Sequence, residues 1–187
     1  VPGKTQDLQD CMINRLVKLE PKTLLIHRLD RDTSGILVFG LSRWGQKSIS
    51  RQFQERQTDK TYQAIVAGHL HGQGTVDVPV IYDPSRPPLH IAELSHNKPA
   101  VTEWKAIEHF EIQGQPVTRV ALTPITGRSH QLRVHMQFLG HPIVGDTLYA
   151  APDQQDLMPR LCLHAERLSF HHPQTDERIE FICPVPF

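Results

Sequence analysis

One stretch near the start of the chain limits the possible folds more than any other. Residues 27–35 read HRLDRDTSG, which places two carboxylates and two guanidiniums within five positions, and residues 36–40 read ILVFG. The apolar run ended by glycine predicts a buried strand. The charged part is rich in turn formers and predicts a loop at the mouth of that strand. A buried carboxylate needs a partner, and functional residues tend to lie on loops held by a rigid scaffold, so this loop is a candidate site.

Length and composition are those of an ordinary soluble protein. The 187 residues are expected to form one domain with a sizeable core. No apolar run approaches the length that spans a membrane, and no signal-peptide pattern opens the chain. Cys11, Cys162 and Cys183 are far apart and form no C-x-x-C pair. This cysteine usage favours a reduced, cytoplasmic protein over a disulfide framework.

The charge of the chain is balanced overall but divided unevenly along it. The formal net charge is zero, which counts mildly against a nucleic-acid partner because such partners usually require a basic surface. Residues 1–68, however, contain eleven Lys and Arg against seven Asp and Glu. A protein with charge divided in this way can present one basic face while remaining neutral as a whole.

Apolar spacing and capping signals predict one helix near the start of the chain and another in its last third. Residues 5–20 have the pattern of an amphipathic helix, with Thr5 or Asp7 as its cap, and this helix is expected to cover one face of a sheet. A second such pattern covers His130–Leu139 and is preceded by Ser129, the expected N-cap.

A third helix is expected over residues 43–56, with Ser42 as its N-cap. Arg43, Lys47 and Arg51 are spaced four residues apart, so their side chains form one cationic stripe along the helix. Such a stripe can contact the phosphates of RNA, or it can be an ordinary solvated helix face. The pattern alone leaves both interpretations open.

The remaining regular patterns are those of strands. Their expected ranges are 60–67, 75–82 with an interruption at Pro79, 101–110 paired with 116–122, and 161–170 paired with 178–183. Many strands, few helices and no regular alternation between the two predict the α+β class with a mixed, largely antiparallel central sheet and flanking helices.

Three motifs in this chain resemble those of the RluA-type pseudouridine synthases. The stretch HRLD-x-x-TSG is similar to the central motif of that family, and Lys60-Thr61-Tyr62 is similar to its K-x-Y segment. Residues 125–135, ITGRSHQLRVH, with the following GHPI and Gly145-Asp146, resemble its third motif. The first motif, K-P-x-G, is missing, and the chain begins at Val1 without Met. Residues 1–187 are therefore expected to be a single catalytic domain, truncated at its amino terminus, with a catalytic cleft across the sheet.

The resemblance implies an enzyme that isomerises uridine to pseudouridine in stem–loop RNA, such as 23S ribosomal RNA or a tRNA anticodon stem–loop. It implies no cofactor and no metal, and RNA as the partner of a monomer that binds no membrane. In this family the Asp of HRLD is catalytic, which here is Asp30. Only one carboxylate is needed, because no leaving group is replaced by water.

The resemblance also implies partners for that carboxylate. Arg133 corresponds to the family arginine expected to form an ion pair that keeps Asp30 charged. Tyr62 is expected to pack against the uracil and to help move a proton. Arg28 is expected to fill the gap left by the flipped-out uridine, and Arg128 to contact phosphate.

Other classes of function remain open at this stage. Asp30 and Asp32 resemble a D-x-D magnesium pair of a phosphotransferase or nuclease, although no glycine-rich phosphate loop accompanies them. Asp32 is also a good turn carboxylate. A non-catalytic RNA-binding module could use the same scaffold. Zinc is not favoured, because the histidines and cysteines lack paired ligand spacing.

Overall fold

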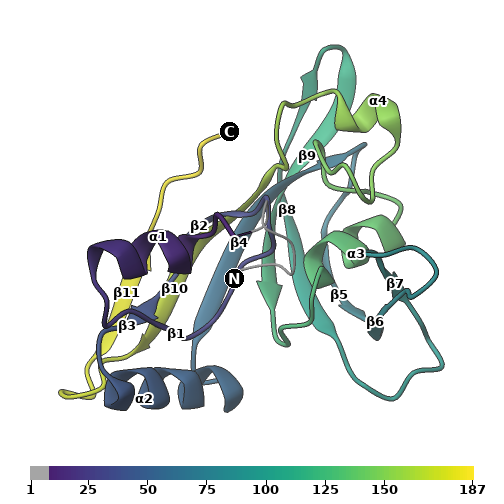
Figure 1. The fold of residues 1–187 in the computed structure, drawn as a ribbon. Helices are drawn as coiled ribbons and strands as arrows, with labels where there is room; N and C mark the ends of the chain where they lie inside the picture. The colour runs from purple at the N-terminus through teal and green to yellow at the C-terminus, as the bar shows by residue number, and fades with distance from the viewer. Residues whose placement is uncertain (1–8) are drawn as a thin grey trace.

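The structure is a computed structural model that describes residues 9–187 (Figure 1). Its centre is a seven-stranded sheet in the order β11-β10-β4-β9-β8-β5, with β2 paired to β10. These strands are β2 (Ser34–Gly35), β4 (Asp59–Ala67), β5 (Gln73–Asp77), β8 (Val101–Ile112), β9 (Gln115–Pro124), β10 (Leu163–His171) and β11 (Arg178–Ile182). Among residues 9–187 only the β2–β10 pair of this sheet is parallel, so the prediction of a mixed, largely antiparallel sheet is confirmed.

Two small ribbons and four helices surround this sheet. The ribbons pair β1 (Leu24–Leu25) with β3 (Phe39–Gly40), and β6 (Val80–Tyr82) with β7 (His90–Ala92). The helices are α1 (Met12–Leu19), α2 (Arg43–Gln54), α3 (Gln131–Phe138) and α4 (Pro152–Gln155). In Figure 1, α2 lies with β1 and β3 at one end of the sheet, whereas α3 lies beside the β6–β7 ribbon.

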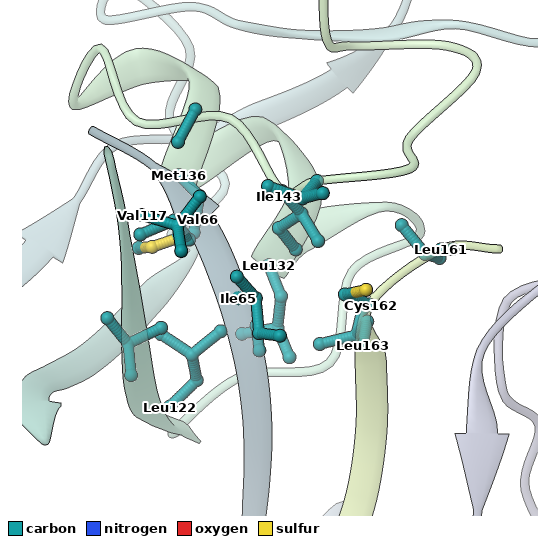
Figure 2. Packing of buried hydrophobic residues seen from close by; sticks show 14 of the residues in the cluster. Ile65, Val66, Val117, Leu122, Leu132, Met136, Ile143, Leu161, Cys162 and Leu163 are labelled. Carbon is teal, nitrogen blue, oxygen red and sulfur yellow. The ribbon is translucent and has the colours of Figure 1, made fainter. Parts of the chain in front are cut away.

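The main core lies between α3 and the central strands β4, β9 and β10. Ile65, Leu122 and Leu163 of these strands lie around Leu132 of α3, and Met136 of the same helix belongs to the same buried cluster (Figure 2). All five side chains are buried, and complete burial of such a side chain contributes about 1.5–3 kcal/mol. The apolar stripe predicted for this helix is therefore the face that attaches it to the sheet.

Most predicted elements are present, but two of the predicted strands differ in their detail. The predicted strand 75–82 separates at Val78-Pro79 into β5 and β6, because proline has no N–H to donate to a sheet. The predicted buried strand 36–40 is only half-buried except at Gly40, and only Phe39–Gly40 pairs as a strand. Its apolar side chains instead pack as loop residues against α2 and β10.

The helix ends also differ from the predictions. Helix α1 begins after Cys11, while Thr5 and Asp7 lie outside the described residues. No residue of α1 is buried, so the expected cover of a sheet face is not found. Ser42 caps α2 as predicted, because its hydroxyl accepts a hydrogen bond from the Gly45 N–H at 3.1 Å. The cap of α3 is His130, in a left-handed conformation with φ of 56°, and not Ser129.

Candidate active site

A cleft of about 710 Å³ opens where four segments of the chain meet. Its walls come from the HRLD loop, the start of β4, one side of α2, and the loop that leads from β9 to α3. The three motifs singled out in the sequence therefore converge on one cavity. Four of the predicted site residues line it: Arg28, Asp30, Tyr62 and Arg128.

The loop that carries Asp30 is fixed by its connection to β10. Thr33 donates its backbone N–H to the Asp30 carbonyl at 3.1 Å, and Ser34–Gly35 then pairs with His164–Ala165. Gly35 has φ of 113°, and a Cβ there would lie 2.2 Å from the Ala165 carbonyl oxygen. Only glycine allows so close an approach of two backbones, which holds the Asp30 loop at the edge of the cleft.

The Asp30 carboxylate is available for chemistry. Within residues 9–187 it takes part in no hydrogen bond and no ion pair shorter than 4.0 Å, although it is half-buried in the cleft wall. Its negative charge nevertheless acts on the titration of four groups around it, which are Tyr62, His130, Arg133 and Tyr149. Asp30 is thus an unpaired carboxylate surrounded by groups that sense its charge.

Asp32 does not share the cavity of Asp30. Its exposed side chain lines a second cavity, together with Arg133 and Arg160. The part of the chain that the structure describes contains no group of three His, Cys, Asp or Glu side chains arranged to hold a metal ion. This arrangement does not favour the reading of Asp30 and Asp32 as a magnesium pair.

Tyr62 lies on β4, between β9 and β10, and its side chain faces the same cleft as Asp30. Burial raises the pKa of its hydroxyl above the usual value, and the negative charge of Asp30 raises it further. The hydroxyl is therefore neutral and able to donate a hydrogen bond at physiological pH.

Arg133 does not form the ion pair predicted with Asp30. Its guanidinium donates two hydrogen bonds to Asp146, from Nε at 2.7 Å and from Nη2 at 2.6 Å. Burial alone lowers the pKa of Arg133, but the Asp146 carboxylate outweighs it, and the net direction is upward. Arg133 stays charged, and Asp30 lies within its electrostatic reach without contacting it.

The loop between β9 and α3 is held by one buried amide. Gln131 Oε1 accepts hydrogen bonds from the Thr126 hydroxyl at 2.7 Å and the Arg128 N–H at 3.0 Å, while its Nε2 donates to the Val101 carbonyl at 2.9 Å. At the rim, the Arg28 guanidinium donates to the Ser129 hydroxyl at 3.3 Å. Gln131 thereby fixes the backbone that carries Arg128 and Ser129.

Two further residues at the cleft were not singled out from the sequence for these roles. Lys60 is half-buried in the wall, and burial, with the Arg56 charge, lowers its pKa. His27 accepts a hydrogen bond from the Val38 N–H through Nε2 at 3.0 Å and stacks on Phe53 at 4.5 Å. Burial lowers the pKa of His27 to about 4, so it is a neutral structural residue. Lys60 belongs to the K-x-Y segment and His27 to the HRLD motif, but neither motif indicated these contacts.

The predicted stripe of Arg43, Lys47 and Arg51 is exposed along α2. Ser50 and Gln54, which follow Lys47 by three and seven residues, line the cleft. Residues with this spacing lie on one side of a helix, so the stripe runs along the cleft edge. This position is compatible with contact to the backbone of a nucleic acid held in the cleft.

Comparison with known proteins agrees with the fold and with the family indicated by the motifs. A family model for RNA pseudouridylate synthase matches residues 2–138. The chain therefore belongs to the RNA pseudouridine synthases, a family of isomerases. A solved structure of "Human RNA Pseudouridylate Synthase Domain Containing 1" aligns with a TM-score of 0.83 and 35% identity, and covers 93% of this chain and 74% of that chain.

Curated relatives show which type of pseudouridine synthase this chain resembles. "Dual-specificity RNA pseudouridine synthase RluA" of Pasteurella multocida is 45% identical over 188 residues, and that of Escherichia coli strain K12 is 42% identical over 189 residues. Both alignments cover 100% of this chain and 84% of the relative. Within its family the chain is of the RluA type, as the resemblance in the sequence indicated.

Proposed function

We propose that this protein converts uridine to pseudouridine in stem–loop RNA, with 23S ribosomal RNA and tRNA anticodon stem–loops as its substrates, and that Asp30 acts on the ribose. Support for two RNA classes comes from relatives named as dual-specificity enzymes. The single observation that carries the chemistry is the unpaired Asp30 carboxylate, which faces the cleft beside the neutral hydroxyl of Tyr62.

The reaction needs no atom from outside the substrate. The bond from ribose C1′ to uracil N1 breaks, the base turns, and a bond from C1′ to C5 forms. The proton on C5 leaves, and N1 gains one, so the product is an isomer. Asp30 either attacks C1′ directly or takes the C2′ proton to give a glycal, and the same carboxylate serves both routes. Tyr62 packs against the uracil and moves a proton.

Arg133 acts on this reaction at a distance. Because Asp146 holds its guanidinium, Arg133 supplies a fixed positive field at Asp30 without covering the carboxylate. A carboxylate without a bound cation is free to approach the sugar carbon. The cation therefore faces Asp30 through its field alone and leaves the carboxylate oxygens open.

The target uridine must leave the RNA stack before C1′ can reach Asp30. Flipping a base costs a few kcal/mol, which contacts to the opened RNA must offset. Arg28 stands at the rim, where a planar guanidinium can fill the vacated position. Arg128 in the cleft and the α2 stripe contact phosphates on either side.

In this proposal the protein acts as a monomer in the cytoplasm. All three cysteines are free, as a reducing compartment allows. Within residues 9–187, no helix combines the length and apolar character required to cross a membrane.

The test is conversion of uridine in a defined hairpin RNA by the purified protein in EDTA. We expect pseudouridine to form at the rate seen with magnesium. Loss of conversion on chelation, restored by magnesium, would contradict the proposed chemistry, and tight RNA binding without conversion would indicate a non-catalytic binding module. The uridines that lose modification in cells without the protein then identify the natural substrates.

A further inference from the structure

A row of three aromatic rings begins at His130, whose chain neighbours Ser129 and Gln131 line the cleft, and ends on the surface of the β6–β7 ribbon. His130, whose titration senses the charge of Asp30, has its ring 4.7 Å from that of His90. The His90 ring in turn lies 5.6 Å from Tyr82. Tyr82 ends the row with half of its surface exposed, at 50%. The row thus connects the surroundings of the catalytic carboxylate to an open aromatic face.

The rings of this row are held in place by a buried hydroxyl. Tyr149, only 6% exposed, accepts a hydrogen bond from the His90 backbone N–H at 2.9 Å. The same hydroxyl lies 2.6 Å from His130 Nδ1. Tyr82 and His90 are also direct partners in the β6–β7 register. The His130 ring and the His90 backbone are therefore held in place before any ligand binds, which lowers the entropic cost of binding.

The arrangement of the rings leaves a face for a ligand. His90 meets Tyr82 edge to face at 66° and His130 at a tilt of 52°, so no pair in the row is stacked in parallel. An exposed tyrosine at the outer end of this row matches the way proteins hold unstacked bases, which stack on aromatic side chains. The motif resemblance and the proposed chemistry make no use of Tyr82 or His90.

We propose that Tyr82 and His90 form a second base-binding subsite, which stacks an unpaired base next to the target uridine in the RNA loop. This inference rests on the proposed function, since it assumes that the loop containing the uridine lies in the cleft. The subsite would recognise an opened loop by its unstacked bases, and stacking on a ring tolerates any of the four bases.

The test uses hairpin RNAs that carry the fluorescent base 2-aminopurine on one side or the other of the target uridine. One of the two positions is expected to change its fluorescence on binding to the protein. Tyr82→Ala should abolish that change and raise KM for the hairpin about fivefold or more, since one stacked base contributes roughly 1–3 kcal/mol. kcat at saturating RNA should stay within about twofold, and Tyr82→Phe should behave as the natural protein.

The matched control is Phe181→Ala, which removes a comparably exposed ring, at 46%, from edge strand β11. It should leave KM and the fluorescence change as they were. His90→Ala provides a second variant, because it keeps the backbone N–H that bonds Tyr149. Unchanged KM and fluorescence in both Tyr82→Ala and His90→Ala would overturn the subsite. Failure of the natural protein to convert any hairpin would instead contradict the proposed function.

Discussion

Arg133 and Asp146 form a two-point ion pair in the interior, with side chains exposed by only 2% and 0%. Asp146 also accepts the backbone N–H groups of Leu148 and Tyr149 at 2.9 and 3.1 Å. The carboxylate thus ties α3 to the chain that follows it and has four donors in all. Arg133 is anchored by structure, so its effect on Asp30 is one of electric field and not of contact.

Asp146→Asn should strongly destabilise the fold. The substitution leaves the Arg133 charge buried without a counter-charge, which costs about 3–5 kcal/mol. Denaturant unfolding measures this loss. The control, Glu180→Gln, breaks the half-exposed pair with Arg167 and should cost less than about 1 kcal/mol. Equal small losses in the two variants would show that the buried pair does not hold α3.

Gly35→Ala should impair both stability and activity. The new Cβ would meet the Ala165 backbone at 2.2 Å and would also strain a φ of 113°. Together these effects should cost about 2–5 kcal/mol and displace the Asp30 loop. Gly114→Ala is the control, since its φ is also positive but nothing lies within 4 Å of a Cβ there. It should cost only about 1–2 kcal/mol and leave turnover intact.

Protonation of His27 should lower stability in mild acid. Its folded pKa is about 4, below the usual 6.5, so the unfolded chain binds the proton more readily. The stability that His27 contributes is fully present above pH 6.5 and is lost as the pH falls toward 4, by at most about 3 kcal/mol. His27→Asn should remove this part of the pH dependence of the unfolding free energy. The same change at exposed His96 should not.

Removal of the α2 stripe should weaken RNA binding and make the binding constant less dependent on salt concentration. Replacement of Arg43, Lys47 and Arg51 by Gln removes three cations. The plot of the logarithm of the binding constant against the logarithm of the salt concentration should therefore become less steep, by about 2–3 in slope. kcat at saturating RNA should change little. The control variant replaces three exposed cations elsewhere, at Lys18, Lys105 and Arg167. A salt slope that falls equally in both variants would contradict the assignment of this helix to the RNA interface.

The elements that sequence predicted well are those with strong local patterns. The hairpin of β8 and β9 turns at Gly114, where its positive φ of 75° suits glycine, and Ser42 caps α2 in the predicted way. Strand β7 was not predicted, because three residues beside a proline-rich loop give no periodic signal. The run 36–40 was misread because apolar side chains can be half-buried in a loop as well as in a strand.

In the site, too, local motifs indicated the residues, whereas contacts between distant segments could not be predicted. The motifs that contain Asp30, Tyr62 and Arg128 do meet at one cleft. The partner of Arg133 could not be read from the chain, because any carboxylate brought near by folding could serve. Asp146 belongs to the third motif, but the motif indicated no role for this residue. The aromatic row to Tyr82 depends on the docking of the β6–β7 ribbon beside α3, which no local pattern encodes.

The most direct test of the account compares Asp30→Asn with Asp32→Asn in single-turnover conversion of one hairpin RNA. Asp30→Asn should lose about a thousandfold or more of the rate, while RNA affinity stays within about threefold. Asp32→Asn, whose side chain lines another cavity, should keep most of the rate. Full turnover by Asp30→Asn would contradict the central claim that this carboxylate acts on the ribose.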